Sequence, residues 1–469
     1  MNYISFFFIY FIIIKNVFDK SSSLEISFKK ETFNINNDFI LSNYDSDIYI
    51  SLKIGSKRDN LEKIFLKSDT NEFMISNSSS QINNNYNPEE SSYSKMIVYL
   101  KTYYQLKYTY KAKIFSDKFF LPNRENKEFS ELGGVSFLYA NKLNIDKYPG
   151  IIGLKLEENQ IKNAKVFPCQ LTDLKYSINS TWMIKYENDN EGYFYVGDIL
   201  NDNIFSGFNS EKYRKTNAVF YGNYLSWDLT FSQIKSNNVI LNGPMQAFLD
   251  FNFGLISCSN EYYDHIKSTF FNEYIKNGMC TELFYYKENN QIKLNSNFAY
   301  IVCDKSLKIK DFPELIFSHS TLDNIFTLTY EDLFVVSNDK TYFLIINEIG
   351  KIERWKIGKI FFKKYNIIFD YNAKTIGIYD DFSNKSKIAL IVLEWIIVIL
   401  LILVVLFLAF ILIKRYRINN YKFFGTKIKV DEMEENYNEF FENKNETKNI
   451  NMDIILILSL KIKTIFFIY

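Results

Sequence analysis

One apolar segment, residues 388–413, constrains this chain more than any other feature. It is 26 residues long and contains a single charged residue, Glu394. A helix of that length extends roughly 39 Å, which is enough to cross a bilayer with some tilt. Lys414 and Arg415 follow at once, and basic residues stay on the cytosolic side of such helices. We therefore expect a transmembrane helix over 388–413 and a cytosolic tail over 414–469.

The N-terminal end of the chain predicts entry into the secretory pathway. Residues 4–14 are apolar and are followed by Lys15; this run is too short to span a bilayer and is typical of a signal-peptide core. We expect residues 1–20 to be a signal peptide and 21–46 to be a leader or short propeptide. The chain is then a type I single-pass membrane protein of the secretory or endolysosomal pathway or the cell surface, with a lumenal or extracellular ectodomain.

Composition excludes several classes of function. The 55 basic and 54 acidic side chains nearly balance, so no overall charge attracts nucleic acid. With only two histidines and no Cys-x-x-Cys pair, neither a zinc site nor a His-based triad is expected, and we expect no cofactor. All four cysteines lie in the lumenal part, where disulfides persist. On the expected lumenal side, three Asn-x-Ser/Thr triplets mark candidate glycan sites: Asn77, Asn179 and Asn384.

Between the two apolar segments the pattern is that of a mainly β protein. Short runs of β-branched and aromatic residues alternate with Asn, Asp and Ser clusters, as in 99–120 and 326–346. The helical candidates are short and cover roughly 169–175, 260–277 and 360–364.

The segment from Trp355 to Asp370 reads Trp-Lys-Ile-Gly-Lys-Ile-Phe-Phe-Lys-Lys-Tyr-Asn-Ile-Ile-Phe-Asp, and Ile-Gly-Ile follows at 376–378. It resembles the closing strand–helix–strand of the pepsin family of aspartic proteases, and the spacing from Gly358 through Tyr365 to Gly377 fits without a gap. The resemblance implies a bilobal, double-barrel ectodomain that is monomeric and binds a polypeptide as substrate or ligand.

Other stretches resemble the same family in the same order. They are Asp47 to Ser56 for the first strand and turn, Tyr148 to Leu154, Phe167 to Leu171, Gly192 to Gly197, and Gln246 to Asp250 for the strand that leads into the second active-site loop. The resemblance covers about 48–379. It implies an N-terminal lobe over 47–205 and a C-terminal lobe over 206–380.

In this family two carboxylates share one proton, each supplied by an Asp-Thr-Gly loop. Residues 250–256 align on the second loop, so Asp250 is retained while Phe251 and Asn252 replace Thr and Gly. The first loop has two registers: one places Lys67 at the catalytic position, and a two-residue deletion places Asp69 there. The candidate catalytic residues are Asp250 and Asp69.

The resemblance also implies a disulfide between Cys280 and Cys303, which match the C-terminal-lobe disulfide of many pepsin-like proteins. Two functions remain open. The chain is either a membrane-anchored aspartic endopeptidase or an inactive homologue whose cleft binds a peptide or protein. An ectodomain of unrelated β architecture, such as an adhesion receptor, requires the resemblance to be accidental. The absence of any glycine between Gly55 and Gly133, where the family has a glycine-containing flap, favours relaxed catalytic constraint.

Overall fold

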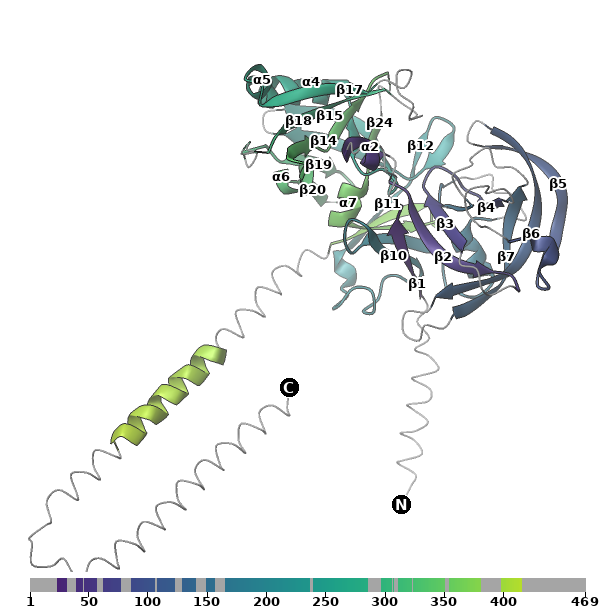
Figure 1. The fold of residues 1–469 in the computed structure, drawn as a ribbon, viewed down its shortest axis with the longest axis horizontal. Helices are drawn as coiled ribbons and strands as arrows, with labels where there is room; N and C mark the ends of the chain where they lie inside the picture. Colours follow the sequence, from purple (N-terminus) through teal and green to yellow (C-terminus); the bar gives the residue numbers. More distant parts are fainter. Residues whose placement is uncertain are drawn as a thin grey trace, which may run out of the picture. The chain divides into compact units, whose positions relative to one another are not determined.

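The computed structural model of the chain (Figure 1) describes the following residues: 23–31, 39–44, 46–56, 62–76, 86–105, 108–122, 129–140, 149–156, 165–236, 239–285, 297–305, 307, 311–322, 324–350, 354–380 and 398–415. The expected signal peptide, the tail beyond residue 415, Asn77 and Asn384 lie outside this part of the chain. The chain divides into two compact units, Met1–Asp381 and Phe382–Tyr469, and each is treated by itself.

The N-terminal half of the first unit contains a six-stranded barrel, drawn in purple and blue in Figure 1. Its strands follow the order β2 (Ile48–Ile54), β3 (Glu62–Lys67), β8 (Gly150–Gly153), β4 (Phe73–Ser76), β7 (Phe129–Ala140) and β6 (Tyr108–Pro122). Pairing of Lys53 and Ile54 with Phe120 and Phe119 brings β2 back to β6 and closes the barrel. Strand β5 (Lys95–Gln105) pairs with the outer edge of β6.

The same 13-stranded sheet continues beyond β2 into strands from both ends of the unit. These are β1 (Ser23–Lys30), β10 (Glu191–Gly197), β9 (Thr181–Tyr186), β25 (Asn366–Asp370), β26 (Thr375–Tyr379) and β11 (Tyr213–Asn217). Trp182 of β9 stacks on Phe369 of β25 with ring centroids 4.2 Å apart, and Trp227 packs edge-on against both rings. Aromatic burial of this kind holds β9, β25 and the segment before β14 together.

Part of the expected leader, 21–46, belongs to this sheet. Strand β1 pairs with β10 on one side and β2 on the other. Its Ile26 and Phe28 are buried while Glu25, Ser27 and Lys29 are exposed, the period-2 pattern of a strand with one face on a core. Residues 23–30 therefore form a central strand of the folded unit.

The C-terminal half of the unit forms a separate 11-stranded sheet. Its order is β20 (Asn324–Leu328), β19 (Leu315–His319), β14 (Asp228–Ser236), β15 (Val239–Leu249), β24 (Arg354–Ile357), β16 (Ile256–Cys258), β23 (Ile345–Glu348), β18 (Phe298–Asp304), β22 (Lys340–Phe343) and β21 (Phe334–Ser337), with β17 (Cys280–Tyr285) paired to β18. Cys280 and Cys303, opposite one another on β17 and β18, form a disulfide, in which Cys169 and Cys258 take no part. A small hairpin, β12 (Val219–Tyr221) and β13 (Tyr224–Ser226), stands apart from both large sheets.

Helices in this unit are short. They are α2 (Phe39–Tyr44), α3 (Phe167–Asp173), α4 (Asn260–Ile266), a π-helical turn (Lys267–Phe271), α5 (Asn272–Lys276), α6 (Tyr330–Leu333) and α7 (Lys359–Lys364), with 3₁₀ turns at Pro88–Glu90 and Ser210–Lys212. The expected strand–helix–strand at the end of the ectodomain is confirmed as β24, α7 and β25, followed by β26.

The second unit contributes one described helix, Val398–Arg415, which is long and apolar enough to cross a membrane. It covers the C-terminal part of the segment expected to span the bilayer; residues 388–397 lie outside the described part. The expectations of a mainly β fold before the apolar segment and of an apolar C-terminal helix are confirmed.

A buried carboxyl group in the barrel leads to a pH-dependent prediction. Glu62, at the start of β3, is 5% exposed, and burial raises its pKa from 4.5 to about 7. The folded state therefore binds a proton more tightly than the unfolded state. The stability that this proton provides is fully present below pH 4.5 and is lost as the pH rises through about 7. We expect Glu62→Gln to raise the free energy of unfolding by about 2–3 kcal/mol at pH 8 and by little at pH 4.

Chemical denaturation of the ectodomain at the two pH values measures this effect. Glu25→Gln, on the exposed face of β1, is the control and should change neither value. An equal gain from Glu62→Gln at pH 4 and pH 8 would contradict the role assigned to the Glu62 carboxyl group.

Candidate functional site

The end of β15 places Asp250 in a buried turn. The Asp250 backbone N–H donates to Ile357 O on β24 at 3.0 Å, and Phe253 N donates to Asp250 O at 3.1 Å, so the chain turns directly after the strand. Asp250 is 6% exposed. The tight turn keeps the carboxylate inside the protein, where each of its charged oxygens requires a partner.

Ser68 lies opposite Asp250, on the turn that follows β3. Its Oγ donates to Asp250 Oδ1 at 2.5 Å, and its backbone N–H donates to Asn252 Oδ1 at 3.1 Å. The Asn252 side chain donates from Nδ2 to Leu66 O at 2.9 Å, and the Asn252 backbone N–H donates to Asp250 Oδ1 at 3.0 Å. Ser68 and Asn252 therefore join the two turns across the interior of the unit.

Lys356 neutralises the Asp250 carboxylate. Its Nζ lies 2.9 Å from Asp250 Oδ2 and 4.1 Å from the centroid of the Phe253 ring, a cation–π distance. Strand alternation explains the placement, because the flanking residues Trp355 and Ile357 are buried on the other face of β24.

Opposing effects set the charge state of Asp250. Burial raises the pKa of its carboxyl group, but the Lys356 charge and hydrogen bonds from Lys356, Ser68 and the Asn252 backbone outweigh burial and lower it below the usual value. Asp250 is therefore an ionised carboxylate at neutral pH and a weak proton acceptor.

The two residues predicted to face Asp250 lie elsewhere. Lys67 points away from Ser68 and forms an ion pair with the fully buried side chain of Asp47. Asp69 is exposed, and it is absent from the groups that contact Asp250 or shift its pKa. The structure brings together Asp250, Ser68, Asn252 and Lys356, of which the sequence reasoning selected only Asp250 as a site residue.

A second layer of contacts holds the backbone of the Asp250 turn from behind. Tyr186 Oη donates to Phe251 O at 2.8 Å, and Lys359 N donates to the carbonyl of Phe253 at 2.6 Å. Gly254 N donates to Asn43 O in α2 at 2.8 Å. A Cβ at Gly254 would lie 2.5 Å from that oxygen, so this close approach requires glycine.

Exposed tyrosines flank the site on the β12–β13 hairpin. Tyr221 and Tyr224 are directly opposed on the two strands and are 46% and 61% exposed. The Tyr221 ring lies 4.1 Å from the Arg354 guanidinium carbon, and Arg354 is two residues from Lys356 on the same face of β24. The Tyr224 ring lies 5.3 Å from Lys155 Nζ, and Lys155 N donates to Thr70 O beyond the Ser68 turn.

The arrangement limits what the site can do chemically. It contains one ionised carboxylate, one ammonium and one hydroxyl, and in the part of the chain that the structure describes no second carboxyl group contacts Asp250. No group of three or more His, Cys, Asp or Glu residues among the described residues is placed to hold a metal ion.

No protein-family model matches the chain, and no curated protein resembles it closely enough to be counted as a match.

Proposed function

We propose that this chain is a pepsin-like, membrane-anchored protein that binds polypeptides without cleaving them. The observation that carries the proposal is the environment of Asp250, which faces Ser68 and Lys356 in place of a second carboxyl group. The proposal adopts the inactive-homologue alternative of the family resemblance.

Aspartic proteases need one carboxylate to accept a proton from water and a second carboxyl group to donate one, with the two pKa values held apart. Here the ammonium of Lys356 lowers the pKa of Asp250, and a serine hydroxyl cannot replace the missing acid. Asp69, the other candidate catalytic residue, is exposed and is not among the described residues that contact the Asp250 carboxylate. These features favour a site that has kept its cross-linked turns and lost its acid–base pair.

The architecture is compatible with the family resemblance. The N-terminal half contains a closed barrel, and the C-terminal half contains a second sheet. Strands from both ends of the unit extend the sheet that forms the barrel. These features agree with a bilobal protein. In this proposal residues 47–205 and 206–380 are the two lobes. The disulfide and the apolar helix favour an ectodomain in an oxidising compartment of the secretory or endolysosomal pathway or at the cell surface, in type I orientation.

Tyr221 and Tyr224 are the proposed contact residues for the polypeptide. Exposed tyrosine rings beside cationic side chains offer apolar area, hydrogen-bonding hydroxyls and little conformational entropy to lose, properties that are enriched where proteins bind one another. Their position beside the Asp250 and Ser68 turns places that surface at the candidate site.

The first test of the proposal measures cleavage. Purified full-length chain in a non-ionic detergent is incubated with unfolded casein and with a quenched-fluorescence peptide library between pH 3 and pH 7. We expect no cleavage above the level of the Asp250→Asn variant at any pH. Cleavage by the wild-type chain that Asp250→Asn abolishes would refute the proposal and restore the endopeptidase alternative.

The second test measures binding. Random decapeptides displayed on phage are selected against the full-length chain, and the affinity of a selected synthetic peptide is measured by fluorescence anisotropy. We expect Tyr221→Ala/Tyr224→Ala to weaken binding at least tenfold. Phe220→Ala is the matched control, because Phe220 is 55% exposed on the same hairpin but alternates to the opposite face. Failure to select any peptide, or equal losses in the two variants, would contradict the proposed surface.

A further inference from the structure

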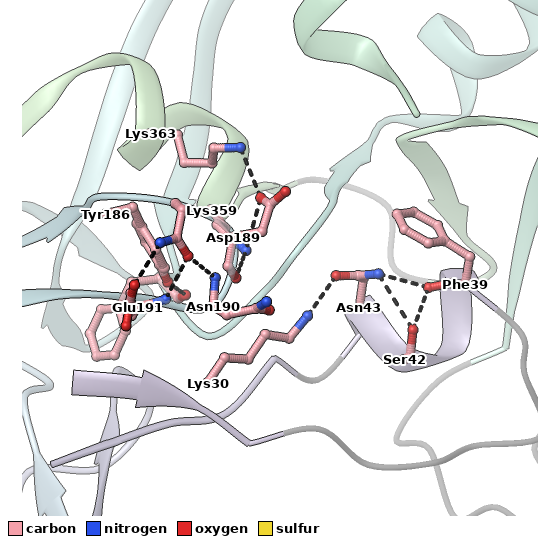
Figure 2. Close-up of polar contacts among 12 residues, drawn as sticks. Lys30, Phe39, Ser42, Asn43, Tyr186, Asp189, Asn190, Glu191, Lys359 and Lys363 are labelled. Atoms are coloured by element: carbon pink, nitrogen blue, oxygen red, sulfur yellow. Dashed lines mark hydrogen bonds and ion pairs between the residues drawn. The ribbon is translucent and has the colours of Figure 1, made fainter. Parts of the chain in front are cut away.

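Three lysines gather around a single aspartate at a place separate from the Asp250 carboxylate (Figure 2). Lys359 and Lys363 belong to α7, Lys30 ends β1, and Asp189 lies in the turn between β9 and β10. Lys359 Nζ lies 3.3 Å from Asp189 Oδ1, and Lys363 Nζ lies 2.8 Å from the same oxygen. One carboxylate therefore serves two ammonium groups.

Lys30 adds a third positive charge, and among the described residues it forms no ion pair with a carboxylate. Its Nζ donates to the side-chain oxygen of Asn43 at 2.9 Å, and its electrostatic attraction to Asp189 is shared with the other two lysines. The next acidic residue, Glu191, is exposed and accepts a hydrogen bond from Asn188. The cluster of Lys30, Lys359, Lys363 and Asp189 thus carries two uncompensated positive charges.

Burial makes this excess charge costly. Lys359 is 5% exposed, and burial followed by the repulsion of Lys30 lowers its pKa to about 8. Burial also lowers the pKa of Lys30. Both shifts mean that the charged forms of the two lysines are destabilised, and a bound anion would remove that penalty.

The cluster is accessible from one side and has hydrogen-bond donors left over. The side chains of Asp189 and Lys363 are 72% and 43% exposed, whereas the Lys359 side chain, behind them, is 6% exposed. Each ammonium has three donors. Lys30 uses one of them on Asn43 and Lys363 one on Asp189, which leaves donors on both for a ligand.

We infer that Lys30, Lys359 and Lys363 form a binding site for a doubly charged oxyanion of the phosphate or sulfate type, either free or as a terminal ester group. Two negative charges match the uncompensated charge of the cluster. The site also adjoins the Asp250 turn through two of its residues. The Asn43 side chain accepts a hydrogen bond from Lys30, and the Asn43 carbonyl accepts one from Gly254 N in that turn. The Lys359 backbone N–H donates to the carbonyl of Phe253 in the same turn. Anion binding therefore steadies the turn that carries Asp250.

The test uses thermal unfolding of the full-length chain in a non-ionic detergent at pH 7. Sodium phosphate, sodium sulfate and glycerol 3-phosphate are titrated, with sodium chloride keeping the ionic strength constant. We expect a saturable rise in Tm for the oxyanions and none for chloride. A response to phosphate and sulfate alone assigns the site to a free ion, whereas a stronger response to glycerol 3-phosphate assigns it to an ester.

Variants separate specific binding from the general salting effect of these anions, which would act equally on every variant. We expect Lys30→Gln/Lys363→Gln to raise the half-saturating phosphate concentration at least tenfold. Lys364→Gln is the matched control on α7, since Lys364 pairs with Asp332, and it should leave the response unchanged.

The single variant Lys30→Gln is a second test. Without added anion its Tm should be higher than that of the wild-type chain, because one uncompensated charge is lost. Its rise in Tm with phosphate should be smaller. The inference is overturned if phosphate acts no more strongly than chloride, or if the double variant responds like the wild-type chain.

Discussion

Replacing Lys356 with methionine is expected to lower the free energy of unfolding by about 3 kcal/mol at pH 7, because it leaves the Asp250 carboxylate buried without its counterion. Methionine fills a similar volume, so packing changes little. The expected loss is larger than that for Lys364→Met, because the Asp332 side chain is 24% exposed against 8% for Asp250 and keeps hydrogen bonds from Thr329 when Lys364 is removed. Chemical denaturation of the ectodomain measures both variants.

The pH dependence distinguishes loss of the ion pair from a packing defect. In the wild-type chain the pKa of Asp250 is lowered, so the stability that its charge provides is present above the ordinary carboxyl pKa of 3.8 and is lost as the pH falls through the folded-state pKa. In Lys356→Met burial dominates and raises that pKa, so the buried group takes up a proton at acid pH and the difference between the two proteins shrinks.

A double variant supplies the internal control for this prediction. Asp250→Asn/Lys356→Met removes the unpaired charge and should recover most of the stability lost in Lys356→Met. A deficit that is the same at pH 3 and pH 7, and that persists in the double variant, would show that Lys356 acts through packing and that the charge assignment is wrong.

The sequence predicted the local elements well, because those depend on neighbouring residues. The aromatic and β-branched runs became strands, and the expected helices at 360–364 and 260–277 correspond to α7 and to the α4, π and α5 series. The expected helix at 169–175 begins two residues earlier, at Phe167, because Pro168 fits the first turn of a helix. These assignments needed no knowledge of which segments meet in space.

The partner of Asp250 was harder to predict, because it depends on strand register. Family spacing selected Lys67 or Asp69. Ile64 and Leu66, however, lie on one face of β3 and belong to a different core cluster from Phe65, and the next residue on the face of Ile64 and Leu66 is Ser68. Counting in twos from Ile64 would have identified Ser68. Lys356 lies 106 positions from Asp250 in the chain. Their ion pair depends on the pairing of β15 with β24, which no local sequence pattern reveals.

Phe28→Ala is expected to destabilise the ectodomain by about 4 kcal/mol, because the side chain is 1% exposed in a strand between two others and its removal leaves a cavity. Phe28 packs edge-on against Tyr186, with ring centroids 5.2 Å apart, and Tyr186 holds the Asp250 turn through the carbonyl of Phe251. Ser27→Ala, on the exposed face of the same strand, should change the stability by less than about 0.5 kcal/mol. Thermal or chemical unfolding of the two variants provides the comparison.

The stability of Phe28→Ala also tests whether the segment expected to be a leader is removed from the mature protein. A propeptide must leave without unfolding the protein, but residues 23–30 pair with strands on both sides. In addition, the Asn43 carbonyl in α2 accepts a hydrogen bond from Gly254 N in the Asp250 turn. We therefore expect mass spectrometry of the mature chain to find residues 23–44 retained. A mature N-terminus near residue 47, together with a small effect of Phe28→Ala, would instead mean that β1 is replaceable and that the segment is released during maturation.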